Sequence, residues 1–322
     1  MNMVKIVLEN GDFPVVLCPV DGPLRQEFLK MGVTVIIDES FTLGHWTFEH
    51  FARNFDIVIA NTLACANAVK LLEKSIPPVL WWIHEGTFAY RYFKNILPNK
   101  LGEKVKIYPV SEYVQNILEE KHLKCQEGLL PYGVDDIRVN NKMQLSNQND
   151  YLFLMIGSIE RRKGQDILLD AIDFLPEQYK KKAQFAFVGN TLEKTLSKRL
   201  LNEIKVNPNI KFYGSIPHEE VYRLYQQSIC VVIPSRDDPL PVVATEAMMF
   251  SRPCICSDYT GTAFFIKDGV NGFIVKNEDS KQLAEKIVYI MDHPEKAKKI
   301  GEAGRRLYDE NFTIEKFKLR VI

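Results

Sequence analysis

Several features that would place this chain in a particular class are scarce or missing. Lys and Arg together number 41 and Asp and Glu together number 41, so the formal net charge is zero. There is thus no global positive field to attract nucleic acid, whose binding depends on neutralising phosphates. No apolar run reaches the roughly 18 residues of a membrane span, and the opening MNMVKIVLENGDF carries acids and a glycine where a signal peptide needs an apolar stretch. We predict a cytoplasmic protein that does not bind nucleic acid.

Metal-binding signatures are also scarce. The six cysteines show no paired C-x-x-C spacing, and reduced, buried thiols are the simpler interpretation. Asp237 and Asp238 are adjacent rather than in a D-x-D arrangement, and side chains of adjacent residues rarely converge on one ion. We therefore predict that the protein needs no metal and no cofactor.

The pattern that is present is an alternation of short apolar runs with amphipathic segments, which is typical of parallel βαβ units. The expected strands cover 13–19, 33–38, 56–62, 78–84 and 106–111, and then 151–157, 183–190, 210–215, 230–235 and 253–258. Residues 137–150 interrupt the series and are rich in Asn, Asp and Gln, as surface connections are. We predict an α/β fold of two Rossmann-like, doubly wound parallel-sheet domains, residues 1–136 and 151–322, joined by a linker over 137–150.

Charged and small residues gather where the strands of the second domain should end, which is where open parallel sheets bind ligands. Asp238 and Glu246 stand eight positions apart across the start of a helix near Pro241, so both carboxylates could face one pocket. The alternative is that Asp238 only caps this helix and Glu246 is solvated. Lys163 precedes another expected helix, whose positive end favours a phosphate-bearing ligand; a solvated turn is the alternative.

These motifs carry a resemblance to a known family. The motifs lie between residue 151 and about residue 305 and read GSIERRKG, FVGN, YGSIP, PSRDDPLPVVATEAMMFSRPCICSD and DGVNGFIV. Together they resemble the donor-binding domain of retaining glycosyltransferases of family four, which have the GT-B fold with a cleft between two domains. A weaker likeness covers DGPLRQEFLKMGV, WWIHEG, YPVSEYV and PYGVD in the first domain.

The resemblance implies a role for particular residues. Glu246 would bind the donor ribose, Lys163 the diphosphate, and Asp238 the transferred sugar. Asp238 stands where Glu is commoner, and Ser158 where many relatives have an Arg that binds phosphate, so Arg161 or Arg162 would have to compensate. The implied donor-binding set is Gly157, Ser158, Arg162, Lys163, Gly189, Asn190, Ile216, Asp238, Pro239, Leu240, Val242 and Glu246.

The first domain contributes two residues of interest. His84, at the end of the strand in WWIHEG, is similar to a histidine that relatives point at the donor sugar, and with Asp238 and Lys163 it completes the implied catalytic set. A structural hydrogen-bonding role is the alternative for His84. Ser111 stands where a helix N-cap belongs, so we expect it to cap that helix, with contact to a ligand as the alternative.

The two ends of the chain also compare with the family. Relatives open with a strand and a Gly-rich loop before their first helix, and MNMVKIVLENG matches the end of that helix, with Gly11 as its C-terminal cap. A strand over VKIVL is the alternative. The resemblance implies an incomplete first domain, for which we expect an oligomeric or other covering partner, and a last helix that returns toward the first domain.

The function implied is that of a retaining, metal-independent hexosyltransferase in polysaccharide biosynthesis. It would move a sugar from a nucleotide-diphosphate sugar to a glycan or lipid-linked acceptor. The alternative is a nucleotide-sugar-binding or partner-binding module that has lost catalysis; a GT-B epimerase is a weaker third option. For RYFKNILPNKLGEKVK we favour a solvated helix and loop, with peripheral contact at the inner membrane face as the alternative.

Overall fold

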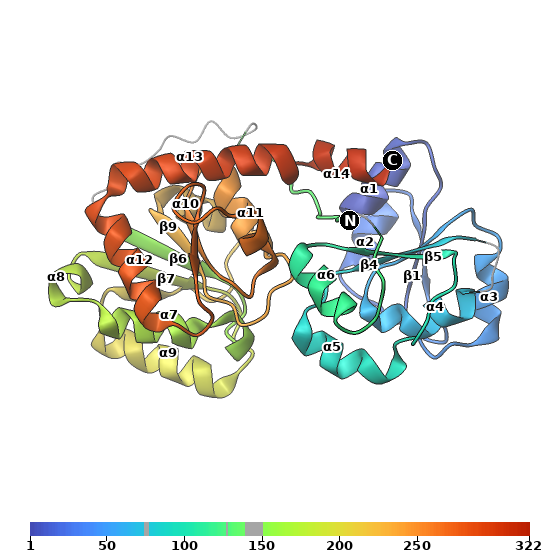
Figure 1. Cartoon of the computed structure of the whole chain (residues 1–322), viewed down its shortest axis with the longest axis horizontal. Helices are drawn as coiled ribbons and strands as arrows, with labels where there is room; N and C mark the ends of the chain where they lie inside the picture. Colours follow the sequence, from blue (N-terminus) through green and yellow to red (C-terminus); the bar gives the residue numbers. More distant parts are fainter. Residues whose placement is uncertain (74–76, 127, 139–150) are drawn as a thin grey trace. The chain divides into compact units, whose positions relative to one another are not determined.

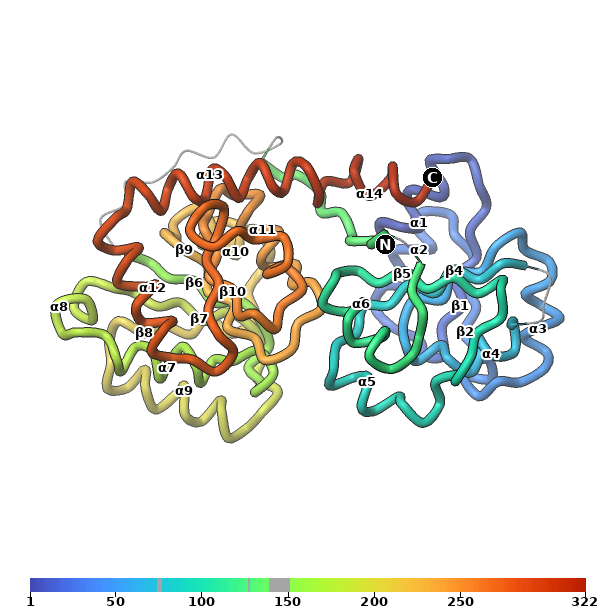
Figure 2. Tube along the Cα trace, viewed as in Figure 1, coloured from blue at the N-terminus to red at the C-terminus, as the bar shows by residue number. Residues whose placement is uncertain are grey.

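The computed structural model describes residues 1–73, 77–126, 128–138 and 151–322. The chain forms two compact units, which are described separately below (Figures 1 and 2). Unit 1 comprises Met1–Gly133 and Ile314–Ile322, and unit 2 comprises Val134–Thr313. Most of the predicted linker, from residue 139 on, lies outside the described residues.

The strands of unit 1 form two parallel sheets. One pairs β1 (Val15–Cys18) with β2 (Thr34–Ile37), and the other has the order β3 (Val58–Ala60), β4 (Val79–Ile83), β5 (Val105–Pro109). Four of the five lie within the predicted runs, and β5 begins one residue before its run. No described strand joins β1 to β3, so the expected single sheet is divided. Four of the five residues of β4 are buried, whereas every residue of β1 is only half-buried.

Helices account for most of the rest of unit 1. The opening segment is helical, as α1, and Gly11 follows with φ +87°, so the alternative of a strand over VKIVL is wrong. Ser111 caps α6 as predicted, because its Oγ accepts a hydrogen bond of 3.4 Å from the N–H of Val114. The helices are α1 (Asn2–Glu9), α2 (Leu24–Lys30), α3 (Trp46–Ala52), α4 (Ala66–Leu72), α5 (Thr87–Phe93), α6 (Glu112–Glu119) and α14 (Ile314–Val321), with short 3-10 helices η1 (Leu63–Cys65) and η2 (Lys94–Ile96).

Unit 2 contains one six-stranded sheet in which every described pairing is parallel. Its strand order is β11-β10-β9-β6-β7-β8. The four inner strands β10, β9, β6 and β7 are mainly apolar because helices cover both faces. The strands are β6 (Tyr151–Ile156), β7 (Ala183–Val188), β8 (Ile210–Phe212), β9 (Cys230–Ile233), β10 (Cys254–Ser257) and β11 (Phe273–Val275).

The helices of unit 2 complete two layers around this sheet. Figure 1 shows α7 and α9 on one face and α10 and α11 on the other. The apolar side chains of α7, α9 and α12 join those of the strands in one buried core. The helices are α7 (Gln165–Phe174), α8 (Glu177–Lys180), α9 (Lys194–Val206), α10 (His218–Gln227), α11 (Val242–Met249), α12 (Ser280–Asp292) and α13 (Pro294–Asn311), with 3-10 helices η3 (Arg161–Lys163) and η4 (Gly261–Phe265).

The observed division differs from the predicted domain boundary at residue 136. Val134 already belongs to unit 2, because its N–H donates to the carbonyl of Phe312 at 2.8 Å and its carbonyl accepts from the Tyr308 hydroxyl at 2.7 Å. At the other end, α14 belongs to unit 1. Within the described part of the chain, no helix is both long and apolar enough to cross a membrane.

Candidate functional site

The loops that follow β6, β7 and β9 pack backbone against backbone at one edge of the sheet of unit 2. A Cβ on Gly189 would lie 2.1 Å from the carbonyl oxygen of Gly157, and a Cβ on Gly164 would lie 2.2 Å from that of Pro234. Both glycines have positive φ, +143° and +80°. Glycine is required at both positions, because a side chain has no room there. The close packing brings the loop at 157–164 next to the loop at 234–241.

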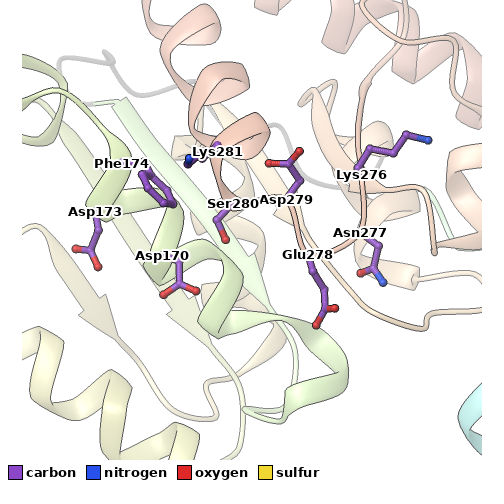
Figure 3. A pocket seen from close by; sticks show the side chains of 9 residues that line it. All are labelled: Asp170, Asp173, Phe174, Lys276, Asn277, Glu278, Asp279, Ser280 and Lys281. Carbon is purple, nitrogen blue, oxygen red and sulfur yellow. The ribbon is translucent and has the colours of Figure 1, made fainter.

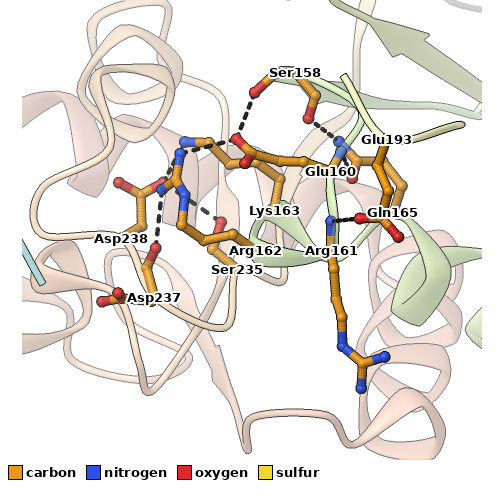
Figure 4. Close-up of polar contacts among 10 residues, drawn as sticks. All are labelled: Ser158, Glu160, Arg161, Arg162, Lys163, Gln165, Glu193, Ser235, Asp237 and Asp238. Carbon is orange, nitrogen blue, oxygen red and sulfur yellow. Dashed lines mark hydrogen bonds and ion pairs between the residues drawn. The ribbon is translucent and has the colours of Figure 1, made fainter. Parts of the chain in front are cut away.

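An ion pair joins these two loops (Figure 4). Lys163, at the end of η3, places Nζ 2.7 Å from Oδ2 of Asp238, and the exposed fractions of the two side chains are 20% and 8%. The main chain of Asp238 is held on both sides: its N–H donates to Tyr259 at 3.1 Å, and its carbonyl accepts from Gly261 at 2.8 Å. The Ser235 hydroxyl lies 3.5 Å from the same Oδ2. The carboxylate is therefore fixed against the lysine, and the alternative of Asp238 as a cap of α11 is wrong, since no side chain caps that helix.

A small cavity lies beside this pair, between the carboxyl ends of β6 and β9. It is lined by Met155, Ile156, Lys163, Val232, Ile233, Ser235, Asp238, Pro241 and Val243. Two of the predicted site residues thus share a cavity at the strand ends. Glu246 is not among its lining residues.

Glu246 lies on α11, which begins one residue after Pro241, and its carboxylate meets a different helix. Its Oε2 accepts a hydrogen bond of 2.8 Å from the hydroxyl of Tyr225, a fully buried residue of α10. Burial raises the pKa of the Glu246 carboxyl, and the hydrogen bond from Tyr225 opposes that rise. The alternative of a freely solvated Glu246 is therefore wrong. Sequence reasoning missed Tyr225, whose spacing from Glu246 does not indicate a contact between two helices.

Arg162 belongs to a second polar network in the same loop (Figure 4). Its Nη1 donates to the carbonyl of Asp237 at 3.0 Å, and its Nη2 lies 3.0 Å from Oε1 of Glu160. The Ser158 hydroxyl donates to the same Oε1 at 2.6 Å, and the Ser158 carbonyl accepts from Gln165 at 2.8 Å. These contacts fix the guanidinium of Arg162 in the same loop as Ser158, the position where many relatives have a charged arginine. Glu160 and Gln165 were not predicted.

Arg236 ties the same loops to α7 and was also missed. Its guanidinium donates to both carboxylate oxygens of Asp166 at 2.8 Å and to the carbonyl of Arg161 at 2.6 Å. Burial alone would raise the pKa of Asp166, but the hydrogen bonds and charge of Arg236 lower it overall. The sequence shows only that an arginine stands next to Asp237. Nothing in the local pattern predicts that Arg236 contacts Asp166, which lies 70 residues away in α7.

The other residues of the predicted donor-binding set lie around the same strand ends. The N–H of Gly189 donates to the Gly214 carbonyl at 2.8 Å, and Oδ1 of Asn190 accepts from the Ser215 hydroxyl at 2.7 Å. Leu240 is buried and Val242 is 44% exposed, while Ile216 and Pro239 are half-buried. Their assignment to a donor stays a prediction.

His84 lies in unit 1, directly after β4. Its Nε2 is 2.7 Å from Oδ1 of Asn61, and its ring lies 4.1 Å from that of Trp82, centroid to centroid. Burial lowers the pKa of His84 to about 4, so the imidazole is neutral at physiological pH. With an amide oxygen as its partner, Nε2 carries the proton and Nδ1 is left as an acceptor. Asn61 and Glu85, which accepts from the His84 N–H at 3.1 Å, were not predicted.

A larger hollow of about 560 Å³ lies apart from the strand-end cavity (Figure 3), although Glu278 in its lining pairs with Arg236 at 2.5 Å. It is formed by the end of α7 and the segment leading into α12, and none of the predicted site residues lines it. Both lysines that line this hollow already have partners within the chain. Lys281 Nζ lies 5.4 Å from the centre of the Phe174 ring, and Lys276 Nζ lies 3.2 Å from Oδ2 of Asp258. Across the described ranges, no three His, Cys, Asp or Glu side chains gather as metal ligands would.

Comparison with known proteins identifies the family. The model described as glycosyl transferases group 1 matches residues 136–307, and the one described as glycosyl-transferase family 4 matches residues 1–127. An uncharacterized glycosyltransferase of Methanocaldococcus jannaschii is 29% identical over 296 residues, which is 89% of this chain and 76% of the relative. O-antigen chain mannosyltransferase C of Escherichia coli is 28% identical over 211 residues, 63% of this chain and 55% of the relative. The chain belongs to the group 1 glycosyltransferases.

Solved structures establish the fold. The structure of Anabaena HepE in complex with UDP has a TM-score of 0.82 at 19% identity, covering 99% of this chain and 93% of that one. WaaG, a glycosyltransferase involved in lipopolysaccharide biosynthesis, has a TM-score of 0.75 at 16% identity, covering 100% of this chain and 93% of that one. The predicted GT-B fold is confirmed, and the chain is a glycosyltransferase of this architecture.

Proposed function

We propose that the strand-end site of unit 2 binds a nucleotide-diphosphate sugar and that the protein transfers the sugar with retention, without a metal ion. The observation that carries the proposal is the pair of Lys163 and Asp238 beside a cavity where β6 and β9 end. A lysine at that position offers a charge to phosphate, and a carboxylate beside it can accept hydrogen bonds from sugar hydroxyls. Structures of Anabaena HepE with UDP and with UDP-glucose support a donor of this class.

Each site residue has a role in this proposal. Lys163 pairs with the diphosphate, Asp238 accepts from hydroxyls of the transferred sugar, and Glu246 accepts from the ribose hydroxyls while Tyr225 holds its carboxylate. In unit 1, neutral His84 accepts a hydrogen bond from a substrate hydroxyl at Nδ1. Arg162 is the cation that replaces the charge missing at Ser158.

The chemistry needs little from side chains beyond fixed charge. The bond from the anomeric carbon to the diphosphate oxygen breaks as a bond from the same carbon to the acceptor oxygen forms on the same face, and a diphosphate oxygen takes the acceptor proton. The negative charge that develops on the leaving diphosphate is met by Lys163 and neighbouring backbone N–H groups. We infer that the acceptor is a glycan or lipid-linked acceptor molecule and that the sugar moved is a hexose.

Transfer assays on the full chain test this proposal. We expect turnover of one donor from a panel of UDP-, GDP- and TDP-hexoses in the presence of EDTA. Lys163→Ala and Glu246→Ala should each lower kcat/KM by about 100-fold or more, because each removes a charged contact to the donor. The matched controls Lys211→Ala and Glu285→Ala remove the same charges from exposed positions of unit 2 and should leave kcat/KM within about twofold. A requirement for added metal, or full activity of Lys163→Ala, would contradict the proposal.

One observation favours the alternative of a nucleotide-sugar-binding module without catalysis. The sheet of unit 1 is divided, and β1 is half-buried along its whole length. Unpaired strand edges favour a covering partner or a second copy. Nucleotide binding by calorimetry with no turnover, together with a mass in solution above that of one chain, would support the alternative and count against transfer by this chain.

A further inference from the structure

The lysine assigned to the diphosphate is already paired with an acid of the same site. Lys163 Nζ and Asp238 Oδ2 lie 2.7 Å apart, and the Asp238 side chain is only 8% exposed. Main-chain hydrogen bonds to Tyr259 and from Gly261 hold Asp238 on both sides. The carboxylate therefore cannot move far when an anion arrives, and its negative charge stays near any phosphate that Lys163 binds.

A fixed carboxylate at this position interacts differently with a sugar nucleotide and with a free nucleoside diphosphate, because the two ligands differ in charge and in hydrogen-bond donors. In a sugar nucleotide the terminal phosphate is esterified and carries one charge, and the sugar beyond it offers hydroxyl donors to the carboxylate. A free nucleoside diphosphate ends in a phosphate of nearly two charges at neutral pH and offers no such donor. Repulsion between two anions a few ångströms apart in a partly buried site is substantial.

We propose that Asp238 is a specificity-determining residue that makes the site favour the sugar-esterified diphosphate over the free nucleoside diphosphate, and so promotes release of the latter after transfer. This rests on the proposed function of the same site. Glu160, the carboxylate of the loop at 157–164, is directed to Arg162 and Ser158 instead of Lys163, so we assign the discrimination to Asp238.

Calorimetric titration of the full chain with UDP and with UDP-glucose tests the inference; GDP and GDP-mannose replace them if the panel above selects guanine. In Asp238→Asn we expect UDP to bind about tenfold more tightly, since the repulsion is gone. UDP-glucose should bind no more tightly than to the wild type. Asp238→Glu keeps the charge and should keep the wild-type ratio of the two affinities within about threefold.

Controls separate the possible failures. Glu160→Gln removes one negative charge from the loop that carries Lys163 and should change the ratio of the two affinities by less than about threefold, because the partner of Glu160 is Arg162. Asp238→Ser is a second neutral variant that keeps the test available if the asparagine variant does not fold. If wild type binds both nucleotides and the neutral variants leave the ratio unchanged, the inference is overturned while the proposed function stands. If wild type binds neither and Lys163→Met changes nothing, the proposed function itself fails.

Discussion

At the scale of single residues, the two carboxylates of the candidate site are held in different ways. Asp238 faces a lysine at 2.7 Å, whereas Glu246 faces a tyrosine hydroxyl at 2.8 Å. A neutral hydrogen-bond donor offsets less of the desolvation cost of a buried carboxylate than a cation does. Burial accordingly raises the pKa of Glu246 despite the hydrogen bond from Tyr225. The charge on Glu246 is therefore sensitive to its surroundings.

Tyr225→Phe is expected to weaken donor binding through Glu246. Removing a hydrogen bond to a charged group should raise the donor KM by roughly tenfold with a smaller change in kcat. The same change removes an interaction that lowers the Glu246 pKa, so that pKa should rise further. Because only the ionised carboxylate accepts two hydroxyls, donor affinity should fall as pH drops through this pKa, and the fall should begin at higher pH in Tyr225→Phe than in wild type.

Donor titrations between about pH 5 and pH 8 check this. Tyr222→Phe is the matched control, because Tyr222 lies on the same helix and near Glu246, whereas the hydroxyl that donates to Oε2 of Glu246 is that of Tyr225. If the pH profile of Tyr225→Phe coincided with that of wild type, Glu246 would not be the group that binds the ribose.

At the scale of elements, the site exists because three loops at the strand ends approach within backbone contact. Gly189, after β7, lies against the carbonyl of Gly157, after β6, and Gly164, in the loop after β6, lies against the carbonyl of Pro234, after β9. These contacts have little tolerance, since backbone atoms cannot move aside as side chains do. The loops that carry Lys163 and Asp238 are therefore positioned by the sheet and not by a ligand.

Gly189→Ala is expected to destabilise unit 2 by about 3 kcal/mol or more, because its Cβ would overlap the Gly157 carbonyl and because φ is unfavourable for alanine. The matched control is Gly214→Ala, which also has positive φ but has no atom within 4 Å of the added Cβ. Gly214→Ala should lower the free energy of unfolding by only about 1 kcal/mol. Chemical denaturation followed by circular dichroism measures both, and equal costs for the two variants would show that the close approach at Gly189 is not rigid.

At the scale of the whole molecule, the chain passes between its two units twice. The first crossing follows Gly133 and the second follows Thr313, after which α14 packs on unit 1. Phe317 of α14 is fully buried and stacks on Trp82 at 5.3 Å, and Lys318 pairs with Glu9 of α1 at 2.9 Å. The C-terminal helix is thus part of the core of unit 1, although the rest of the C-terminal half forms unit 2.

Phe317→Ala is expected to destabilise unit 1 by about 3–5 kcal/mol, as deletion of a buried aromatic side chain does. All three tryptophans, Trp46, Trp81 and Trp82, lie in unit 1, so tryptophan fluorescence follows the unfolding of that unit. The fluorescence midpoint in urea should fall, while the exchange protection of amides in the sheet of unit 2 should change little. Leu319→Ala, which removes a 76% exposed side chain from the same helix, should change the free energy of unfolding by less than about 0.5 kcal/mol. Equal changes in both variants would contradict the packing of Phe317.

The sequence by itself determined the α/β class, the positions of ten of the eleven described strands, all but β11, and the loops that carry the candidate site. Strand alternation and glycine placement are local properties, because the side-chain period and the backbone freedom of glycine act within a few residues. Lys163, Asp238 and Glu246 could therefore be selected from their motifs alone. The resemblance to family four extended this selection to a donor class.

Only the tertiary structure decided which of these residues meet. Lys163 and Asp238 are 75 residues apart, Tyr225 and Glu246 are 21 apart on different helices, and Arg236 reaches Asp166 across 70 residues. The divided sheet of unit 1 was likewise settled by packing, whereas the return of the last helix was already implied by the family resemblance. The physical reason is that burial and hydrogen bonding between distant segments depend on how whole elements pack, and a local pattern contains no information on which partner a buried polar group will find.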